Sequence, residues 1–274
     1  MKKSALIIVI MFSFCSCKSL IKTYKQEVDN EIKLNSIENA EIITESDIAH
    51  LPEPVQKYFR FTGIVGKPMP YNCTIDWEDV QFKMSPEKEW IPIKCLQFNS
   101  VKEPARFAYL YAPKMGINIF VGRDKYQQGK GNMHIKLLGL FTIQDAWGKA
   151  MDESSLVTIL SETLFVPGYA LQQYVSWEEI DSLSAKATIT HNGISVSGIF
   201  YFNEKGEMTH FTSYDRNYVD TDGNEQKVEW VANVEYYTQR DGLILPGYVS
   251  ATWKRQEGDY QYFKGKIKAL KFNS

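Results

Sequence analysis

The chain contains four histidines, the residues best suited to hold a metal ion or to transfer a proton near neutral pH. They are His50, His134, His191 and His210. No two of them have the spacing of metal ligands, and the chain has no Cys-x-x-Cys, His-Glu-x-x-His or Gly-x-Ser-x-Gly motif. We therefore expect no metal, no cofactor and no catalytic residue that the sequence alone can name.

Carboxylates offer another route to chemistry, because two acids held in one cavity can carry out acid–base catalysis. Glu178, Glu179 and Asp181 form a cluster that we expect in a solvated loop. Glu162 lies among the apolar residues of a predicted helix. Inside a cavity it would need a partner such as Arg216, so we place it on the solvent face of the helix instead.

Aromatic residues give the strongest positive signal, with 6 Trp, 16 Tyr and 15 Phe, many of them in predicted strands. They would line any cavity that the strands enclose, and aromatic-lined cavities bind apolar or amphiphilic ligands. The alternative is that they fill a solid core. The wall or lid residues predicted for a cavity are Trp77, Phe82, Leu160, Leu164, Phe165 and Trp230.

Strands must position these side chains, because from residue 70 onward apolar residues recur at every second position. Cys73, Ile75 and Trp77 alternate with polar residues, and the phase then slips by one residue. This slip predicts a β-bulge at Glu78–Asp79. Further strands are predicted at 91–98, 106–112, 117–126, 133–138, 140–145, 185–190, 194–203, 208–218, 227–239, 245–255 and 260–272.

Helices are predicted only near the start and in the middle of the chain. Thr44 to Asp47 has the pattern of a helix start, and a second helix with proline in its first turn ends at Gly63. An apolar stripe over residues 151–166 predicts a third helix with Asp152 as its cap. Another short helix is predicted at 169–174.

The predicted fold class is therefore mainly β (α+β). Hairpin-linked strands favour a curved antiparallel sheet, an incomplete β-barrel, with the mid-chain helical insertion as a lid and a short N-terminal helix. The alternative is two packed halves that meet near residue 150.

The first 17 residues are typical of an export signal. Two lysines precede an apolar run from Ala5 to Phe12, which is shorter than the ~20 residues needed to span a bilayer. Cys17, after Ser16, is similar to the lipidated cysteine of bacterial lipoproteins. We expect residues 1–16 to be a signal peptide, 17–44 a lipidated tether and 45–274 one β-rich domain. The predicted location is the cell envelope, on the outer membrane facing the periplasm.

Two cysteines, Cys73 and Cys95, fall in the predicted domain. On a hairpin that turns near Pro86 they would be offset by about six residues, which at ~3.3 Å per residue is beyond disulfide reach. We expect two free, half-buried thiols.

Several short motifs resemble landmarks of a bacterial family that is known only as a domain of unknown function. The most specific runs from Leu51 to Gly63 (LPEPVQKYFRFTG). The others are Gly129–Gly131 with Leu137–Leu140, Leu160–Pro167 and Trp177–Asp181. The resemblance implies no activity, cofactor or catalytic residue. The expected architecture is also similar to that of periplasmic lipoprotein carriers, incomplete barrels closed by helices around an apolar cavity.

The net charge of −2, without a basic patch, disfavours a nucleic-acid partner. The sequence favours a non-catalytic envelope lipoprotein, held on the membrane by its N-terminal lipid, that binds a lipid or another hydrophobic molecule. One alternative is a structural or partner-binding envelope protein with a filled core. Another is a hydrolase or isomerase that uses cavity carboxylates.

Overall fold

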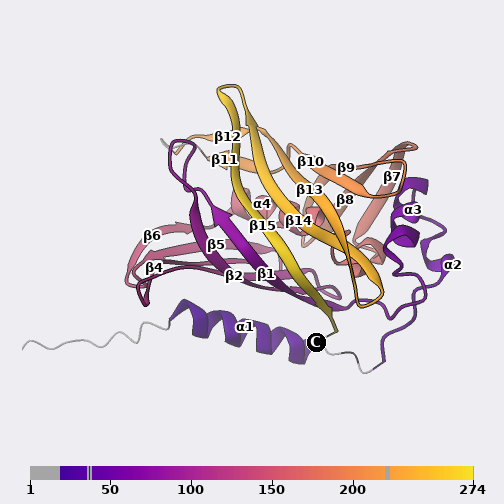
Figure 1. The fold of residues 1–274 in the computed structure, drawn as a ribbon, viewed down its shortest axis with the longest axis horizontal. Helices are drawn as coiled ribbons and strands as arrows, with labels where there is room; N and C mark the ends of the chain where they lie inside the picture. The colour runs from indigo at the N-terminus through magenta and orange to yellow at the C-terminus, as the bar shows by residue number, and fades with distance from the viewer. Residues whose placement is uncertain (1–18, 36, 38, 220–222, 274) are drawn as a thin grey trace, which may run out of the picture.

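A computed structural model describes residues 19–35, 37, 39–219 and 223–273 (Figure 1). The helices are α1 (Leu20–Leu34), α2 (Glu45–Ile48), α3 (Glu53–Thr62), α4 (Lys149–Ser161) and the 3-10 helix η1 (Pro167–Leu171). The strands are β1 (Asn72–Phe82), β2 (Ile91–Ser100), β3 (Ala105–Lys114), β4 (Ile117–Gln127), β5 (Lys130–Leu137), β6 (Phe141–Ala146), β7 (Val175–Asp181), β8 (Ser184–His191), β9 (Ile194–Phe202), β10 (Met208–Ser213), β11 (Asn217–Val219), β12 (Glu225–Lys227), β13 (Glu229–Arg240), β14 (Leu243–Arg255) and β15 (Gly258–Phe272).

Within the described residues, thirteen strands form one sheet in the order β6-β5-β4-β3-β2-β1-β15-β14-β13-β10-β9-β8-β7. Every neighbouring pair is antiparallel. Pairing of β1 with β15 joins the two runs of hairpins into one surface, which curls around α4 (Figure 1). The predicted mainly β, half-barrel architecture with a mid-chain helix is confirmed.

The predicted bulge in β1 is present. The partners of β1 on β15 shift between Asp76 and Trp77 and again between Glu78 and Gln81. Asp79 has a φ of +49°, a left-handed conformation that takes it out of the regular ladder. Because of the extra residue, Trp77 and Phe82 point to the same, concave face although their spacing is odd.

Helix α4 lies on the concave face and approaches β5 closely. A Cβ on Gly131 would lie 2.4 Å from the carbonyl oxygen of Met151, so only glycine fits there. The predicted capping role of Asp152 is wrong, because Gly148 holds the N-cap position. The Asp152 carboxylate instead accepts the Gly131 N–H at 2.8 Å and the Lys130 ammonium at 3.0 Å. It therefore fastens the helix to the sheet.

Helix α1 covers the opposite, convex face of the same strands. Leu20 and Tyr24 pack against Phe107 and Tyr109, whereas the alternate residues of β3 face α4. Glu27 pairs with Arg123 and Lys125 at 2.8 and 3.0 Å, and Glu31 accepts a hydrogen bond from Gln127 at 2.8 Å. Helix and strand β4 thus run in the same direction, and the start of α1 lies toward the start of β4.

The two short helices agree with the sequence prediction. The backbone N–H of Thr44 donates to the Asp47 carboxylate at 2.7 Å, which closes the first turn of α2. Gly63, with a φ of +72°, ends α3 in the left-handed conformation.

Other expectations for the second half of the chain were wrong. Residues 175–181 form strand β7 rather than a loop, and the helix expected at 169–174 is η1, which ends at Leu171. The strand expected over 208–218 breaks after Ser213, because Asp215 turns inward and accepts the Ser197 N–H at 2.7 Å.

Both domain cysteines are free thiols, as predicted, but they are fully rather than half buried. Cys73 pairs across the hairpin with Asn99, four residues from Cys95. None of the helices within the described residues is long and apolar enough to cross a membrane.

Candidate functional site

The concave face of the sheet and α4 enclose a cavity of about 120 Å³. Its apolar wall consists of Trp77, Phe82, Ala108, Leu110, Met133, Phe165, Trp230, Ala232, Val249, Ala251 and Phe263. Its polar lining includes Gln97, Arg106, Asp124, Thr158, Ser161, Glu162, Arg216 and Ser250. Strands from both runs of the sheet contribute, so the cavity exists only because β1 pairs with β15.

The volume limits what the cavity can hold. Complete pockets for drug-sized ligands measure about 300–1,000 Å³, whereas an apolar cavity of about 150 Å³ accepts one benzene ring. A cavity of about 120 Å³ therefore fits a ring or a short stretch of acyl chain. The rest of a longer ligand would lie outside the cavity.

Two larger hollows, of about 430 and 300 Å³, lie elsewhere on the protein. Exposed charged residues such as Asp79 and Lys94 line the first, and Lys254 and Glu257 line the second. Neither combines an apolar wall with buried polar groups, which is the combination that fixes a small ligand in one orientation.

A buried polar network forms the floor of the cavity and centres on Glu162. One carboxylate oxygen of Glu162 accepts Arg106 Nε at 2.9 Å. Its other oxygen accepts Gln97 Nε2 and Asn99 Nδ2 at 2.9 and 2.8 Å. Arg106 also binds Asp124 at 2.8 Å. Every charge in the network has an opposite charge or a hydrogen bond beside it, the condition under which buried charges are tolerated.

The electrostatics of this network keep Arg106 charged. Burial lowers the pKa of its guanidinium, but the carboxylates of Glu162 and Asp124 outweigh burial, so the pKa lies above the ordinary value. Both carboxylates are thus held by one cation, Arg106.

The solvent-face position expected for Glu162 is wrong, as is its expected partner. Its side chain is buried, and its cation is Arg106 of β3 rather than Arg216. Glu162 directly follows α4, which has buried residues all around its circumference and hence no fully solvated face. The carboxylate is accommodated because the alternation of β3 points Arg106 toward α4.

Arg216 lies at the other side of the cavity, in the bend between β10 and β11. Its guanidinium is 4.8 Å from the centre of the Trp230 ring, and it donates to the Ser154 carbonyl at 2.7 Å and to the Thr158 hydroxyl. Among the described residues, no carboxylate lies within ion-pair distance of Arg216. The stacking on indole and the bonds to α4 therefore hold this cation in place.

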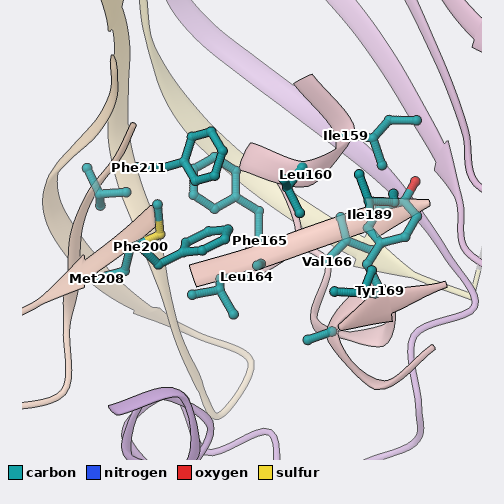
Figure 2. Packing of buried hydrophobic residues seen from close by; sticks show 14 of the residues in the cluster. Ile159, Leu160, Leu164, Phe165, Val166, Tyr169, Ile189, Phe200, Met208 and Phe211 are labelled. Atoms are coloured by element: carbon teal, nitrogen blue, oxygen red, sulfur yellow. The ribbon is translucent and has the colours of Figure 1, made fainter. Parts of the chain in front are cut away.

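Four of the six predicted wall residues line the cavity: Trp77, Phe82, Phe165 and Trp230. Trp77 also donates its indole N–H to Gln97 at 3.1 Å, which links the apolar wall to the polar floor. The other two predicted residues, Leu160 and Leu164, lie outside the cavity lining. They are buried in the core beside Phe200 and Phe211 (Figure 2). Cys17, the predicted lipidation site, lies outside the described residues.

Cys95 is the one cavity-lining residue that carries a thiol. Burial raises its pKa to about 12, so the thiol stays protonated and is a poor nucleophile near neutral pH. Burial also raises the pKa of the Cys73 thiol, which lies in the solid core.

The carboxylates considered for catalysis on sequence grounds have structural partners at the surface. Glu179 accepts the Glu53 N–H at the start of α3, Glu178 pairs with Lys186 at 3.7 Å, and Asp181 closes a turn with Leu183. In the described part of the chain, no three His, Cys, Asp or Glu side chains gather as metal ligands do.

Sequence reasoning missed most of the polar floor, namely Gln97, Asn99, Arg106 and Asp124. A signal was present in β3, where Arg106 is in phase with Ala108 and Leu110. A charged residue in phase with the buried face of a strand marks a position that needs an internal partner. The identity of that partner, 56 residues away on another element, carries no local signal.

Comparison with known proteins gives a family but no activity. The model of DUF6544, described as a family of unknown function, matches residues 41–265. No curated protein matches the chain. The family resemblance expected from the sequence is confirmed.

Similar solved structures include a putative outer membrane lipoprotein-sorting protein domain from Vibrio parahaemolyticus, with 11% identity and a TM-score of 0.44 over 80% of this chain and 91% of that one. A LolA superfamily protein from Nitrosomonas europaea has 10% identity and a TM-score of 0.41 over 80% and 93% of the two chains. A DUF1329 family protein from Desulfovibrio piger has 9% identity and a TM-score of 0.39 over 80% and 93%.

Proposed function

The chain belongs to the DUF6544 family of unknown function, and we propose from the chemistry of its cavity that it binds a hydrophobic small molecule or part of a lipid without transforming it. The observation that carries this proposal is the aromatic and aliphatic wall above a polar floor whose charges are paired. Transfer of an apolar group from water to such a wall is favourable by roughly 25 cal/mol per Å² of surface buried.

The size of the cavity sharpens the proposed ligand class. Since about 120 Å³ fits one ring or a short acyl segment, the ligand is held by its end, and the remainder stays near the opening.

The proposed location is the cell envelope. Residues 1–16 have the pattern of a signal peptide, and a diacylglycerol group on Cys17 would hold the domain at a membrane surface, where hydrophobic ligands concentrate. The outer membrane, on its periplasmic side, is the proposed site. The proposed division of the chain remains a signal peptide (1–16), a lipidated tether (17–44) and one β-rich domain (45–274).

A second candidate function is partner binding by an envelope protein that carries no ligand. The observation that favours it is the large continuous core, into which most of the strand aromatics pack, including Phe200 and Phe211 at 4.7 Å between ring centres. An enzymatic role for the floor carboxylates is disfavoured, because Arg106 binds both of them.

The test is binding of a fluorescent fatty acid to the chain, to a cavity-filling variant and to a matched control. Ala251→Leu places three extra carbon atoms in the cavity, whereas Ala269→Leu adds the same atoms on β15 opposite Asp76, away from the lining. We expect Ala251→Leu to weaken binding at least ~10-fold, about 1.4 kcal/mol, and Ala269→Leu to leave it unchanged. Equal binding by all three proteins would exclude the cavity as the site.

A further inference from the structure

Two hairpins at one end of the sheet carry large apolar side chains where the backbone favours small polar ones. Met115 and Leu138 have φ values of +51° and +52°, and each precedes a glycine that also has a positive φ. Turns of this geometry favour Asn-Gly or Asp-Gly, because asparagine and aspartate tolerate the left-handed conformation best. Methionine and leucine at these positions are therefore not explained by turn formation.

Other tight turns of the same molecule follow the usual rule. Asn192-Gly193 and Asp241-Gly242 have φ values of +49° for the first residue, and Gln128-Gly129 has +51°. All three place a polar side chain before the glycine. Among the tight turns in the described residues, a large apolar side chain before the glycine is thus found in the hairpins β3–β4 and β5–β6.

Folding does not bury these side chains either. Met115 is 98% exposed, and in the neighbouring turn Leu140 and Phe141 are 72% and 64% exposed. Ile117 and Leu138 are also exposed. The two hairpins lie side by side, since the Leu138 N–H donates to the Ile119 carbonyl at 3.0 Å. We call Met115, Ile117, Leu138, Leu140 and Phe141 the hairpin-tip face.

The N-terminal end of the described chain lies toward this face. The pairing of Glu27 with Arg123 and of Glu31 with Gln127 makes α1 run parallel to β4. Seven residues back from Glu27, ~10 Å along the helix, Leu20 lies toward the start of β4. Ser19, the first described residue, which directly precedes α1, therefore lies on the side of the hairpin-tip face.

The apolar part of the cavity lining on β3 lies toward the same end of the sheet. Along β3, Arg106 forms the polar floor, Ala108 and Leu110 follow in the wall, and the strand ends at the turn with Met115. From Leu110 to Met115 the distance along an extended chain is ~17 Å. The order along the strand is thus polar floor, apolar wall and exposed apolar tip.

We propose that the hairpin-tip face inserts into the surface of a lipid bilayer and orients the cavity toward it. Exposed apolar residues at loop tips lose water on entering the acyl boundary, which offsets the unfavourable turn conformations. A protein partner fits less well, because stable interfaces use about 20–30 residues on each side. This docking goes beyond the proposed ligand binding and does not depend on it.

The test measures contact between single sites and lipid chains in the full-length protein bound to phosphatidylethanolamine–phosphatidylglycerol vesicles. A fluorophore on Met115→Cys is quenched by nitroxide-labelled acyl chains if that site enters the bilayer. The matched control is Gln128→Cys, in the equivalent turn at the opposite end of β4. The full-length chain has four cysteines of its own, Cys15, Cys17, Cys73 and Cys95, so the signal of the unsubstituted chain, treated with the same fluorophore, is subtracted as background.

We expect quenching at position 115 to exceed that at position 128 by at least ~5-fold. Equal quenching at the two sites, or none at either, would overturn the proposal. So would protection of position 115 from a water-soluble quencher without quenching by lipid, because that result would place another protein, such as a second copy of this chain, on the face.

A second variant separates docking from folding and from ligand binding. Met115→Asn with Leu138→Asn supplies the residues that the turns favour, so the thermal midpoint should stay equal or rise. With the fluorophore on Leu140→Cys, lipid quenching should fall several-fold in this variant and remain unchanged in Ala251→Leu. Retained quenching in the asparagine variant would contradict the proposal whatever the cavity binds.

Discussion

The two sides of the segment from Thr158 to Phe165 are both buried, yet they meet different surroundings. Leu160 and Leu164 pack against Phe200 and Phe211 in a continuous core (Figure 2). Thr158, Ser161 and Glu162 face the cavity instead. The same short segment thus faces the filled core on one side and the cavity on the other.

The difference lies in what each side chain requires of its neighbours. Leucine and phenylalanine interdigitate without directional demands, so the core side closes completely. Glu162 must stay within hydrogen-bond distance of Arg106, Gln97 and Asn99, which fixes α4 at a set distance from β2 and β3. A polar network that cannot be compressed therefore keeps the apolar wall above it from collapsing.

Removing the carboxylate should give the largest effect. In Glu162→Leu, Arg106 keeps Asp124 as its anion and Gln97 Oε1 as a neutral acceptor. The amides of Gln97 and Asn99 lose their shared carboxylate acceptor. We expect a loss of about 3–5 kcal/mol in the free energy of unfolding, measured by chemical denaturation.

An exposed ion pair provides the control for that variant. Lys254→Ala removes a surface partner of Asp259 and should cost less than ~1 kcal/mol. A loss in Glu162→Leu no larger than the loss in Lys254→Ala would show that the network does not hold the two elements apart.

An alanine-to-leucine substitution should lower the free energy of unfolding by different amounts in the core and in the cavity, and both losses should be smaller than that of Glu162→Leu. Ala187→Leu adds atoms to the filled core and should cost about 1–3 kcal/mol. Ala251→Leu adds them to the cavity, so its unfolding free energy should change by less than ~1 kcal/mol. Thermal and chemical unfolding of the two variants measure the difference, and equal losses would mean that the cavity side is as tightly packed as the core.

The smallest effect concerns the two thiols. The pKa of Cys95 is about 12, so its reaction with a small neutral alkylating reagent should be slow at pH 8 and should rise about tenfold per pH unit up to pH 10. Cys95 lines the cavity and Cys73 lies in the core, so Cys95 should react first. Peptide mass mapping distinguishes the two sites. Faster labelling of Cys73 than of Cys95 would contradict the difference between the filled core and the cavity.

Much of the sheet could be predicted from sequence because its determinants are local. The phase slip after Trp77 predicts the bulge, and Gly63 and Gly193 mark the ends of elements through their left-handed backbone. Strand β7 was missed because its second half, with Glu178, Glu179 and Asp181, is charged and exposed, as expected for an edge strand, and only Val175 and Trp177 reach the core.

The sequence left open whether the sheet encloses a cavity or a filled core. Four of the six residues predicted for a cavity wall, Trp77, Phe82, Phe165 and Trp230, do line the cavity, since large side chains on a curling sheet point inward. Glu162 was misplaced because its partner Arg106 is 56 residues away. Whether a helical carboxylate is solvated or buried depends on the opposite strand, and no local pattern contains that information.

Native mass spectrometry of the protein extracted from its own envelope is the most direct test of the central claim, that the cavity holds a hydrophobic ligand. We predict a stoichiometric apolar ligand on the chain that is absent from Ala251→Leu and present on Ala269→Leu. A ligand-free mass for the unsubstituted chain, together with no uptake of fluorescent fatty acid, would contradict the claim and favour the partner-binding protein with a filled core.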